Sequence, residues 1–366
     1  MAGDLKRKIV FVTGPRQVGK TTLAKNLKRF HPALYYLNYD SDDDRLVFLR
    51  RQWDRKADLV VLDEIHKHRN WKTILKGVYD TEGVRPRILV TGSARLDVYR
   101  RGGDSLAGRY FRHRLLPFSV AELGHEGKPA EILKNLIALG GFPEPFLGNS
   151  DRKARRWRKT HLERIVREDV QDLEPVSDIR ALILLIDLLR ERVGSPIRYS
   201  SLAGDIQVSP HTVKRWVDIL EEMYVVFRVT PWHRSISRSI LKEPKIYFFD
   251  TGQVRGDEGA RLENTFAVSI LKHLWYLEDT RGADVGLHYV RDKQKREVDF
   301  LIVTDHRPKM LMEVKSSDDH PTPAIRHYAR VLGVESCQAV LRLKRPLTIS
   351  GVRVCDAAEF LSGLKA

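Results

Sequence analysis

Short apolar runs alternate with amphipathic stretches along the first third of the chain. The runs that are continuously apolar and rich in Val, Ile and Leu lie at residues 8–13, 58–63 and 87–91. Runs of this length and composition are typical of strands buried on both faces of a parallel sheet. Leu23, Leu27 and Phe30 are spaced as on one face of a helix that follows the first strand. This order predicts an α/β fold, a doubly wound parallel sheet over residues 1–118.

The pattern becomes helical after residue 119. One buried helix face is predicted from the spacing of Ile132, Leu133, Leu136 and Ile137. A second amphipathic helix is expected from Ser209, an N-cap followed by Pro210, with its buried face formed by Val213, Trp216, Val217 and Leu220. Beyond residue 262 a helix precedes two strand-like runs, at 296–303 and 309–315, with a hairpin turn at 305–308. The second half of the chain is therefore predicted to be mixed helix and sheet.

The first strand runs into a glycine-rich loop with the spacing G-x-x-x-x-G-K-T. Its nine residues are Gly14, Pro15, Arg16, Gln17, Val18, Gly19, Lys20, Thr21 and Thr22. Glycines let backbone N–H groups turn inward around phosphates, and the following helix points its positive end at them. Lys20 would reach the β- and γ-phosphates, and Thr21 would offer its hydroxyl to Mg²⁺. The loop therefore predicts ATP and Mg²⁺ as cofactors.

Polar side chains end the second and third strands. Asp63 and Glu64 follow the run at 58–63, and Ser93 follows the run at 87–91. Ligands bind at the carboxyl ends of strands in doubly wound sheets, so Asp63 is expected to hold Mg²⁺ through water. Glu64 is predicted to orient and polarise the attacking water. Ser93 or Thr91 would contact the γ-phosphate or that water, and a simple hydrogen-bonded turn is the alternative.

These motifs together resemble a prokaryotic family of AAA-type P-loop ATPases with a catalytic glutamate. The resemblance rests on residues 14–22, Asp-Glu-Ile at 63–65, Thr-Gly-Ser at 91–93 and Leu-Ala-Gly-Arg at 106–109. It implies that Arg109 is the arginine that stabilises transition-state charge, in cis or from a neighbouring copy. It also implies a C-terminal uncharacterised domain with a restriction-endonuclease-like core. One departure is His66, which stands where relatives commonly have glutamine.

Charge is distributed unevenly along the chain. The formal net charge is +16, of which +15 lies in residues 1–168, and the remainder of the chain is almost neutral. A basic excess is typical of proteins that bind polyanions, although ATP is itself a polyanion. A dense basic stretch at 152–159 surrounds Trp157 and is either a solvated helix face or a polyanion contact. No apolar run is long enough to span a bilayer, and two cysteines fit a reducing, cytoplasmic location.

The segment around residue 209 looks like a winged helix. The buried face of its second helix leaves four residues pointing outward near the N-terminal end: His211, Thr212, Lys214 and Arg215. A recognition helix reads a DNA groove with residues at this end. Residues 224–229 would form the wing. Such modules also mediate protein contacts, so both DNA and a protein remain open as the partner.

Carboxylates recur in the C-terminal strands with the spacing Asp…Glu-x-Lys. These residues are Asp299 on the first strand and Glu313 and Lys315 on the second, and alternation places Glu313 and Lys315 on one face. The constellation is that of restriction-endonuclease-like nucleases, in which Asp299 and Glu313 would hold a divalent ion and Lys315 would activate water. Glu263 on the preceding helix resembles the additional carboxylate of that fold. A buried ion-pair network is the alternative.

The sequence thus predicts four segments. They are an ATPase core (1–118), a helical lid with a basic linker (119–192), a winged helix (193–252) and a restriction-endonuclease-like α/β domain (253–366). The leading hypothesis is a cytoplasmic Mg²⁺-dependent ATPase that couples its nucleotide state to a DNA-binding, nuclease-like region. The alternatives are an ATP-dependent switch that binds a protein partner and a DNA-binding regulator. A homo-oligomer would be needed if Arg109 acts in trans.

Overall fold

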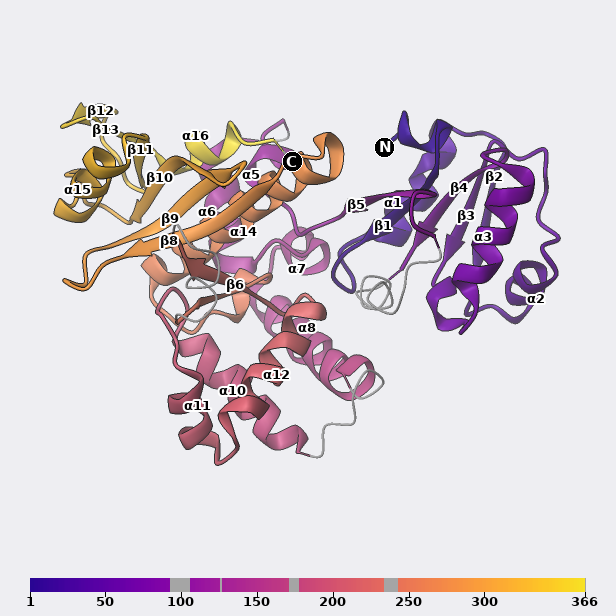
Figure 1. Cartoon of the computed structure of the whole chain (residues 1–366), viewed down its shortest axis with the longest axis horizontal. Helices are drawn as coiled ribbons and strands as arrows, with labels where there is room; N and C mark the ends of the chain where they lie inside the picture. Colours follow the sequence, from indigo (N-terminus) through magenta and orange to yellow (C-terminus); the bar gives the residue numbers. More distant parts are fainter. Residues whose placement is uncertain (93–105, 126, 171–177, 234–242, 366) are drawn as a thin grey trace. The chain divides into compact units, whose positions relative to one another are not determined.

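The computed structural model describes residues 1–92, 106–125, 127–170, 178–233 and 243–365 (Figure 1). The chain folds into two compact units, Met1–Leu116 and Pro117–Ala366. Each unit has its own sheet and its own core.

The N-terminal unit is built on a five-stranded sheet in the order β2-β3-β4-β1-β5. Its strands are β1 (Ile9–Thr13), β2 (Leu34–Asn38), β3 (Leu59–Asp63), β4 (Arg87–Thr91) and β5 (Tyr110–Arg114). All four strand pairs are parallel, and the register pairs Asp63 with Thr91 and Asn38 with Asp63. The carboxyl ends of the strands therefore meet at one edge, and the predicted parallel α/β sheet is confirmed.

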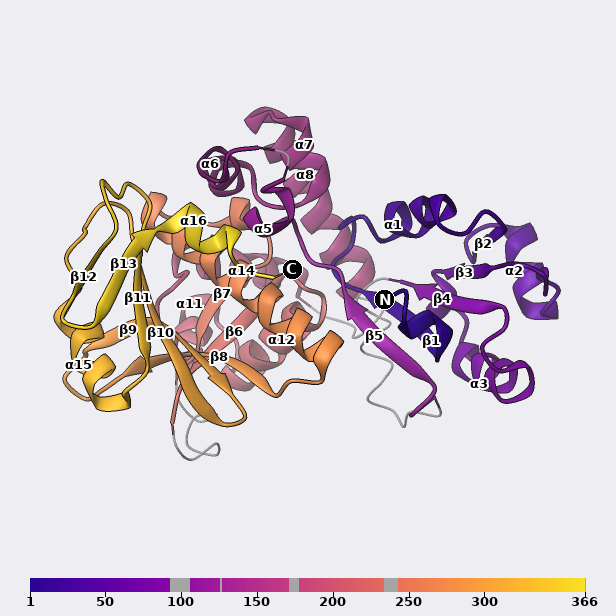
Figure 2. The same cartoon turned by 90° about the horizontal axis from the view of Figure 1, so that it is seen from above.

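Helices cover both faces of this sheet (Figures 1 and 2). They are α1 (Lys20–Asn26), α2 (Asp42–Arg50) and α3 (Trp71–Glu82), with short 3₁₀ turns at Asp4–Lys6, Leu27–Arg29 and Ile65–Lys67. Successive strand residues point to opposite faces, so Val10 and Val12 pack with Ala24 of α1 while Ile9 and Phe11 pack with Trp71 of α3. Two apolar layers result, which explains why the strands are apolar without alternation.

The second unit begins with helices. These are α5 (Val120–Leu123), α6 (Pro129–Leu139), α7 (Pro143–Gly148), α8 (Asp151–Arg164), α10 (Ile179–Glu191), α11 (Tyr199–Ile206) and α12 (Pro210–Glu222), with a π-helical turn at Ile165–Val170 after α8. The predicted start of α12 is confirmed, because the Ser209 hydroxyl accepts a hydrogen bond from the backbone N–H of Thr212 at 3.0 Å. The predicted apolar faces of α6 and α12 are also buried.

An eight-stranded sheet forms the rest of this unit, in the order β12-β13-β11-β10-β9-β8-β6-β7. Its strands are β6 (Val226–Pro231), β7 (Lys245–Phe248), β8 (Val285–Arg291), β9 (Glu297–Thr304), β10 (Arg307–Lys315), β11 (Glu335–Val340), β12 (Leu347–Ile349) and β13 (Val352–Asp356). The helices among these strands are α14 (Glu258–Arg281), α15 (Pro323–Leu332) and α16 (Ala357–Ser362), with a 3₁₀ turn at Thr251–Gln253. Strands β8, β9 and β10 are antiparallel neighbours, and α15 carries the chain into β11, parallel to β10.

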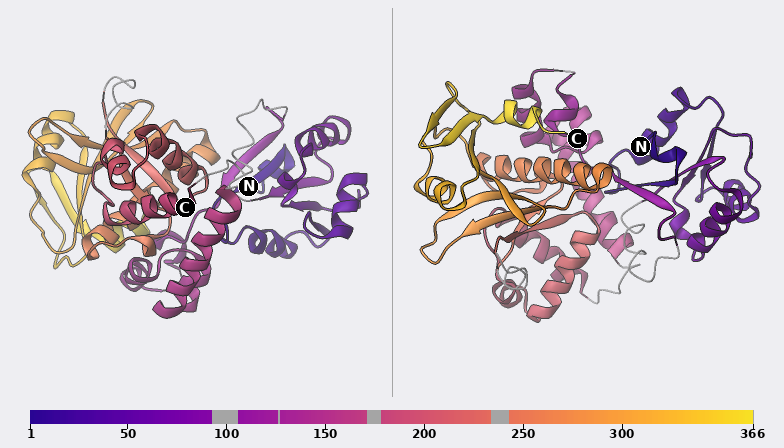
Figure 3. Two further views of the ribbon diagram at one scale, coloured as in Figure 1. Left: turned by 90° about the horizontal axis from the view of Figure 1, so that it is seen from below. Right: turned by 45° about the horizontal axis from the view of Figure 1, so that its top comes forward.

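Strand β6 joins the segment after α12 to the C-terminal sheet. It pairs with β7 in antiparallel fashion and with β8 in parallel fashion, through Thr230 opposite His288. The long helix α14 packs against β7, β8 and β10 (Figures 2 and 3). The expected segments 193–252 and 253–366 therefore share one sheet rather than forming separate layers.

Candidate functional site

The glycine-rich loop connects β1 to α1 at the carboxyl edge of the first sheet. Gly14 has φ +145°, and a Cβ there would lie 2.1 Å from the carbonyl oxygen of Leu115. Gly19, with φ +102°, turns the chain into α1. Lys20 is 7 % exposed, and its Nζ donates hydrogen bonds to the carbonyl oxygens of Gly14 at 3.0 Å and Pro15 at 2.6 Å. The loop thus folds back around its own lysine, as a phosphate-binding loop requires.

Asp63 is the centre of a hydroxyl network beside this loop. It is 2 % exposed and accepts hydrogen bonds from Thr21 at 2.8 Å, Tyr36 at 2.6 Å and Thr91 at 2.6 Å. The two strands beside β3, namely β2 and β4, and helix α1 thus each contribute a hydroxyl donor to the Asp63 carboxylate. The contact of Thr21 with Asp63 joins the two residues expected at Mg²⁺. Their hydroxyl and carboxylate oxygens fit the hard oxygen ligands that Mg²⁺ prefers.

Tyr36 is a member of this network that sequence reasoning missed. Burial and the hydrogen bond to Asp63 raise the pKa of its hydroxyl, so the phenol stays protonated and donates. The signal that could have found it is strand register. Tyr36 on β2 lies opposite Val61 of β3, two residues before Asp63.

Glu64 follows Asp63 in a left-handed backbone conformation, with φ +61°. Its backbone N–H donates to the carbonyl oxygen of Thr91 at 2.9 Å, which ties the turn to β4. Its carboxylate lies 3.6 Å from Nε2 of His66 and 3.6 Å from Nζ of Lys67. Burial raises the pKa of Glu64, which suits a carboxylate that accepts a proton. His66, the departure noted in the sequence, thus lies beside the candidate base.

Arg109 lies at the other edge of the sheet. Its backbone oxygen accepts from the N–H of Ile9, the first residue of β1, and its guanidinium binds both oxygens of Asp80, at 2.7 and 3.1 Å. A five-residue strand spans about 13 Å, so the guanidinium is directed away from the glycine loop of its own chain. This placement does not support the cis role. Ser93, the other expected catalytic residue of this unit, lies outside the described residues.

The C-terminal carboxylates form a cluster around a buried lysine side chain. Lys245 of β7 is 1 % exposed, and its Nζ lies 2.8 Å from Glu297, 3.5 Å from Glu263 and 3.6 Å from Asp299. Burial alone would lower the pKa of Lys245, but these carboxylates raise it above its ordinary value. The lysine is therefore charged and offsets part of the negative charge of the cluster.

Asn264 sets the position of Glu263 in this cluster. It is fully buried, donates to the carbonyl oxygen of Phe248 at 2.9 Å and accepts from the N–H of Phe248 at 2.8 Å. This clamp fixes α14 against β7. Glu263 consequently accepts a 2.6 Å hydrogen bond from the hydroxyl of Tyr247. Burial and the neighbouring Asp299 raise the pKa of Glu263.

Glu313 and Lys315 lie on one face of β10, as strand alternation predicted. Their side chains form a 2.9 Å ion pair, and Glu313 also accepts from the hydroxyl of Thr322 at 2.6 Å. Asp299 accepts from the backbone N–H of Val314 at 3.0 Å, which joins β9 to β10 at this point. Burial, with Asp299 as the second cause, raises the pKa of Glu313.

In the structure these carboxylates take part in ion pairs with lysines. Among the described residues, the three donor groups that lie within 4.8 Å of one another are Asp318, Asp319 and His320, on a turn after β10. Nζ of Lys245 lies within 3.6 Å of Glu263 and Asp299, and Lys315 pairs with Glu313. That Glu263, Asp299 and Glu313 hold a metal ion stays a prediction. The lone lysine in the apolar run of β7 was the signal that sequence reasoning missed.

The outward residues of α12 are placed as expected. His211, Lys214 and Arg215 are exposed and Thr212 is half-buried, while Val213 and Trp216 are buried. The basic stretch of α8 is only partly exposed. Trp157 and Arg158 are both 8 % exposed, with Trp157 stacked on His161 and Arg158 paired with Asp250 at 3.1 Å. Only part of that stretch is therefore a solvated face.

Comparison with known proteins identifies three regions. Residues 6–124 match an AAA domain (AAA_14), residues 130–255 a domain of unknown function (DUF8612) and residues 258–348 another (DUF4143). The chain thus has an AAA-type ATPase-like domain followed by a C-terminal DUF4143 domain. No helix in the described parts of the chain is long and apolar enough to cross a membrane.

Similar full-length relatives are themselves described as uncharacterized. Protein Rv2008c of Mycobacterium tuberculosis is 26% identical over 345 residues, which cover 92% of this chain and 76% of the relative. Protein MJ1637 of Methanocaldococcus jannaschii is 24% identical, covering 84% of this chain and 76% of the relative. The arrangement of both regions in one chain therefore recurs in bacteria and archaea.

Two solved structures are similar to part of the chain. The Bacillus subtilis DNA clamp loader delta protein has a TM-score of 0.26 and 10% identity, covering 60% of this chain and 86% of that one. Drosophila ORC bound to DNA has a TM-score of 0.25 and 12% identity, covering 67% of this chain and 88% of that one. Scores this low support no conclusion about fold or function.

Proposed function

We propose that the chain is a Mg²⁺-dependent ATPase whose nucleotide state is coupled to a DNA-binding, nuclease-like C-terminal region. The observation that carries the ATPase assignment is the network in which Asp63 accepts hydrogen bonds from Thr21 and Thr91 beside Lys20. A phosphate loop, a Mg²⁺-binding pair and an adjacent carboxylate are the parts that ATP hydrolysis needs. The match of residues 6–124 to an AAA domain supports the same assignment.

Each residue of this site has a role in the proposed reaction. Backbone N–H groups of the loop and Lys20 bind the β- and γ-phosphates, and Thr21 and Asp63 hold Mg²⁺, which neutralises phosphate charge when bound. Glu64 orients the attacking water and takes up its proton. His66 and Lys67, each 3.6 Å from the Glu64 carboxylate, hold that side chain in place.

The test is Glu64→Gln. Because the amide keeps the shape of the carboxylate but cannot accept the proton, turnover should fall about 10²- to 10⁴-fold while ATP binding persists. Turnover is measured by phosphate release and binding by equilibrium titration with labelled ATP. Glu131→Gln, an exposed carboxylate of α6, is the matched control and should keep full activity. Unchanged hydrolysis in Glu64→Gln rejects the assignment.

The proposal for the C-terminal region rests on the order of its elements. Helix α14, the meander β8-β9-β10, helix α15 and strand β11 follow one another, with Glu263, Asp299, Glu313 and Lys315 at the positions expected of a restriction-endonuclease-like core. Helices α10, α11 and α12 followed by the pair β6-β7 are the elements of a winged helix, and α12 exposes His211, Lys214 and Arg215. This combination favours DNA as the partner.

Cleavage assays separate this proposal from its alternatives. Linear, circular and single-stranded DNA are incubated with the full chain, with and without ATP, in Mg²⁺ or Mn²⁺. Cleavage that disappears in Asp299→Ala supports the nuclease-like assignment. DNA binding that depends on Lys214 and Arg215 but persists in Asp299→Ala without cleavage favours a regulator. Neither binding nor cleavage, with a protein partner recovered instead, favours a protein-binding switch.

In the proposed ATPase reaction, Arg109 acts only on ATP bound to a second copy of the chain. Arg109 pairs with Asp80 at the edge of the sheet opposite the glycine loop. We therefore assign it the trans role, in which its guanidinium enters the ATP site of a neighbouring subunit. Arg109→Ala should then lower ATP turnover more in a concentrated, oligomeric sample than in a dilute one.

A further inference from the structure

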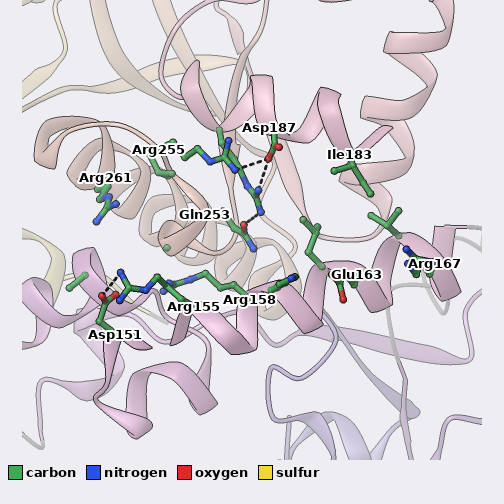
Figure 4. Close-up of a pocket in the computed structure, with 17 residues that line it drawn as sticks. Asp151, Arg155, Arg158, Glu163, Arg167, Ile183, Asp187, Gln253, Arg255 and Arg261 are labelled. Atoms are coloured by element: carbon green, nitrogen blue, oxygen red, sulfur yellow. Dashed lines mark hydrogen bonds and ion pairs between the residues drawn. The ribbon is translucent and has the colours of Figure 1, made fainter. Parts of the chain in front are cut away.

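A cavity of about 590 Å³ lies within the second unit, and its lining does not include Glu263, Asp299 or Glu313 (Figure 4). Helix α8 forms one wall and α10 the other, and the segment from Gly252 to Arg261 closes the side between them. Cavities of this size are those that hold a small organic ligand such as a nucleotide.

The lining of this cavity is strongly basic. It contains seven arginine and lysine side chains and three carboxylates, a formal excess of four positive charges. Apolar atoms of Leu162, Val166 and Ile183 also line it. A cavity that combines clustered cations with an apolar wall suits a ligand that has an anionic end and a flat or apolar end.

Four of these cations form ion pairs with carboxylates of the protein. Arg155 pairs with Asp151 at 2.9 Å, and Arg158 with Asp250 at 3.1 Å. Arg190 and Arg255 share Asp187, at 2.6 and 3.1 Å, as Figure 4 shows. These pairs fix the shape of the walls.

The other three cations have no acidic partner among the described residues. Lys159 and Arg167 come from α8 and the turn that follows it, and Arg261 comes from the first turns of α14. Among the described residues, Glu163 is the lining carboxylate that forms no ion pair. The unneutralised groups therefore still leave an excess of positive charge that the fold itself does not balance.

Buried donors add a second, independent observation. Nε of Arg190 and Nε of Arg261 are shielded from solvent and have no hydrogen-bond acceptor. A buried N–H without an acceptor costs free energy, about 1–3 kcal/mol as a general figure. Phosphate oxygens are the acceptors that guanidinium groups bind best, often through two N–H groups at once.

We propose that this cavity is a second anion site that binds a small organic polyphosphate of the nucleoside di- or triphosphate class. Arg261 and Lys159 bind the phosphates, and the apolar wall contacts the rest of the ligand. The nucleotide-sized volume favours a small ligand over the continuous backbone of a nucleic acid, which needs an extended groove. This site is separate from the glycine loop, so its existence does not depend on ATP hydrolysis.

The test uses the full chain with Lys20→Ala, which removes the main phosphate contact of the glycine loop. ADP, ATP and inorganic pyrophosphate are titrated by calorimetry, and a 12-residue single-stranded oligonucleotide is titrated in parallel. ADP should still bind, and Lys159→Gln combined with Arg261→Gln should weaken that binding at least tenfold. Arg156→Gln, an exposed cation of α8 outside the cavity, is the matched control and should leave it unchanged.

Three results would overturn the proposal. They are the loss of all nucleotide binding in Lys20→Ala, binding that Lys159→Gln with Arg261→Gln leaves unaltered, and oligonucleotide binding that is tighter than ADP binding and lost in the same pair. If Lys20→Ala does not fold, the otherwise unaltered chain provides the second measurement. Its ADP stoichiometry should be two per chain and should fall to one in the Lys159→Gln, Arg261→Gln variant. A failed ATPase assay with two bound nucleotides would reject the proposed function and leave this site standing.

Discussion

The ammonium group of Lys245 lies 2.8 Å from the carboxylate of Glu297, with the lysine side chain 1 % exposed. Glu263 and Asp299 approach the same nitrogen from α14 and β9. Three carboxylates therefore share one internal cation. The resulting network places one buried ammonium group among carboxylates from α14 and β9.

Lys245→Met tests how far the stability of the chain depends on this buried lysine. Removing one partner of a buried ion pair leaves uncompensated charge, so we expect a loss of about 3–5 kcal/mol in the free energy of unfolding. Urea unfolding measures this loss, and 5 mM Mn²⁺ should restore part of it in the variant. Lys309→Met, an exposed lysine on β10, is the control and should change stability little. A stable Lys245→Met chain without Mn²⁺ would contradict the network.

Gly14 offers a test of the glycine loop that does not touch a catalytic side chain. In Gly14→Ala the new Cβ would lie 2.1 Å from the Leu115 carbonyl oxygen, and φ +145° is strained for alanine, so the loop must shift. ATP binding should fall at least tenfold, measured by titration with a labelled nucleotide.

Gly77→Ala is the matched control. This glycine lies inside α3 with nothing within 4 Å of the added Cβ. The substitution should leave ATP binding unchanged and stabilise the chain by about 0.5–1 kcal/mol, because alanine favours the helix. Equal losses of binding in the two variants would show that the loop conformation is not what the phosphates need.

Removal of two arginines of α8 should lower the free energy of unfolding by very different amounts. Arg158 is buried between Asp250 and the carbonyl oxygen of Leu139, whereas Arg155 pairs with Asp151 at the surface. Arg158→Met should cost about 3–5 kcal/mol because it leaves Asp250 buried without its cation. Arg155→Met should cost no more than about 0.5 kcal/mol, since exposed ion pairs contribute little. Thermal and urea unfolding distinguish the two, and equal costs would contradict the difference in burial.

The lowered pKa of His288 should make the free energy of unfolding depend on pH. Burial lowers its pKa below the ordinary value of 6.5, and its Nδ1 lies 3.2 Å from the Thr230 hydroxyl. In the pH range between the lowered pKa and 6.5 the unfolded chain binds more protons than the folded chain. The contribution of the neutral, buried His288 to the free energy of unfolding is therefore fully present above pH 6.5. It is lost as the pH falls from 6.5 to the lowered pKa.

His288→Gln removes this titration. Urea unfolding at pH 7.5 and 5.5 should show a smaller loss of stability on acidification in the variant than in the unaltered chain. The comparison between the two chains isolates His288, because every other titrating group is common to both. An identical pH dependence would mean that His288 titrates alike in the folded and unfolded states.

Helices, strands and turns were predictable from the sequence wherever residues close together in the chain determine them. The strands before the glycine loop, before Asp63 and before Thr91 follow from continuous apolar runs, and the N-cap at Ser209 follows from the chemistry of a single residue. The turn between β9 and β10 also appears where the hydrophobic pattern breaks, with Asp305 and His306 both at positive φ. These features depend on neighbours within a few positions, so the linear order of residues contains them.

The partners of charged side chains were not predictable in this way. Arg158 meets Asp250 and Lys245 meets Glu297 only after helices and strands from distant parts of the chain have packed together. Arg109 likewise belongs to a recognisable motif, but the parallel register of β5 with β1 puts it at the edge opposite the glycine loop. The sequence by itself thus determined the nucleotide-binding loop, because that site is local. The tertiary structure alone decided which charges neutralise one another, because burial and distance exist only in the folded chain.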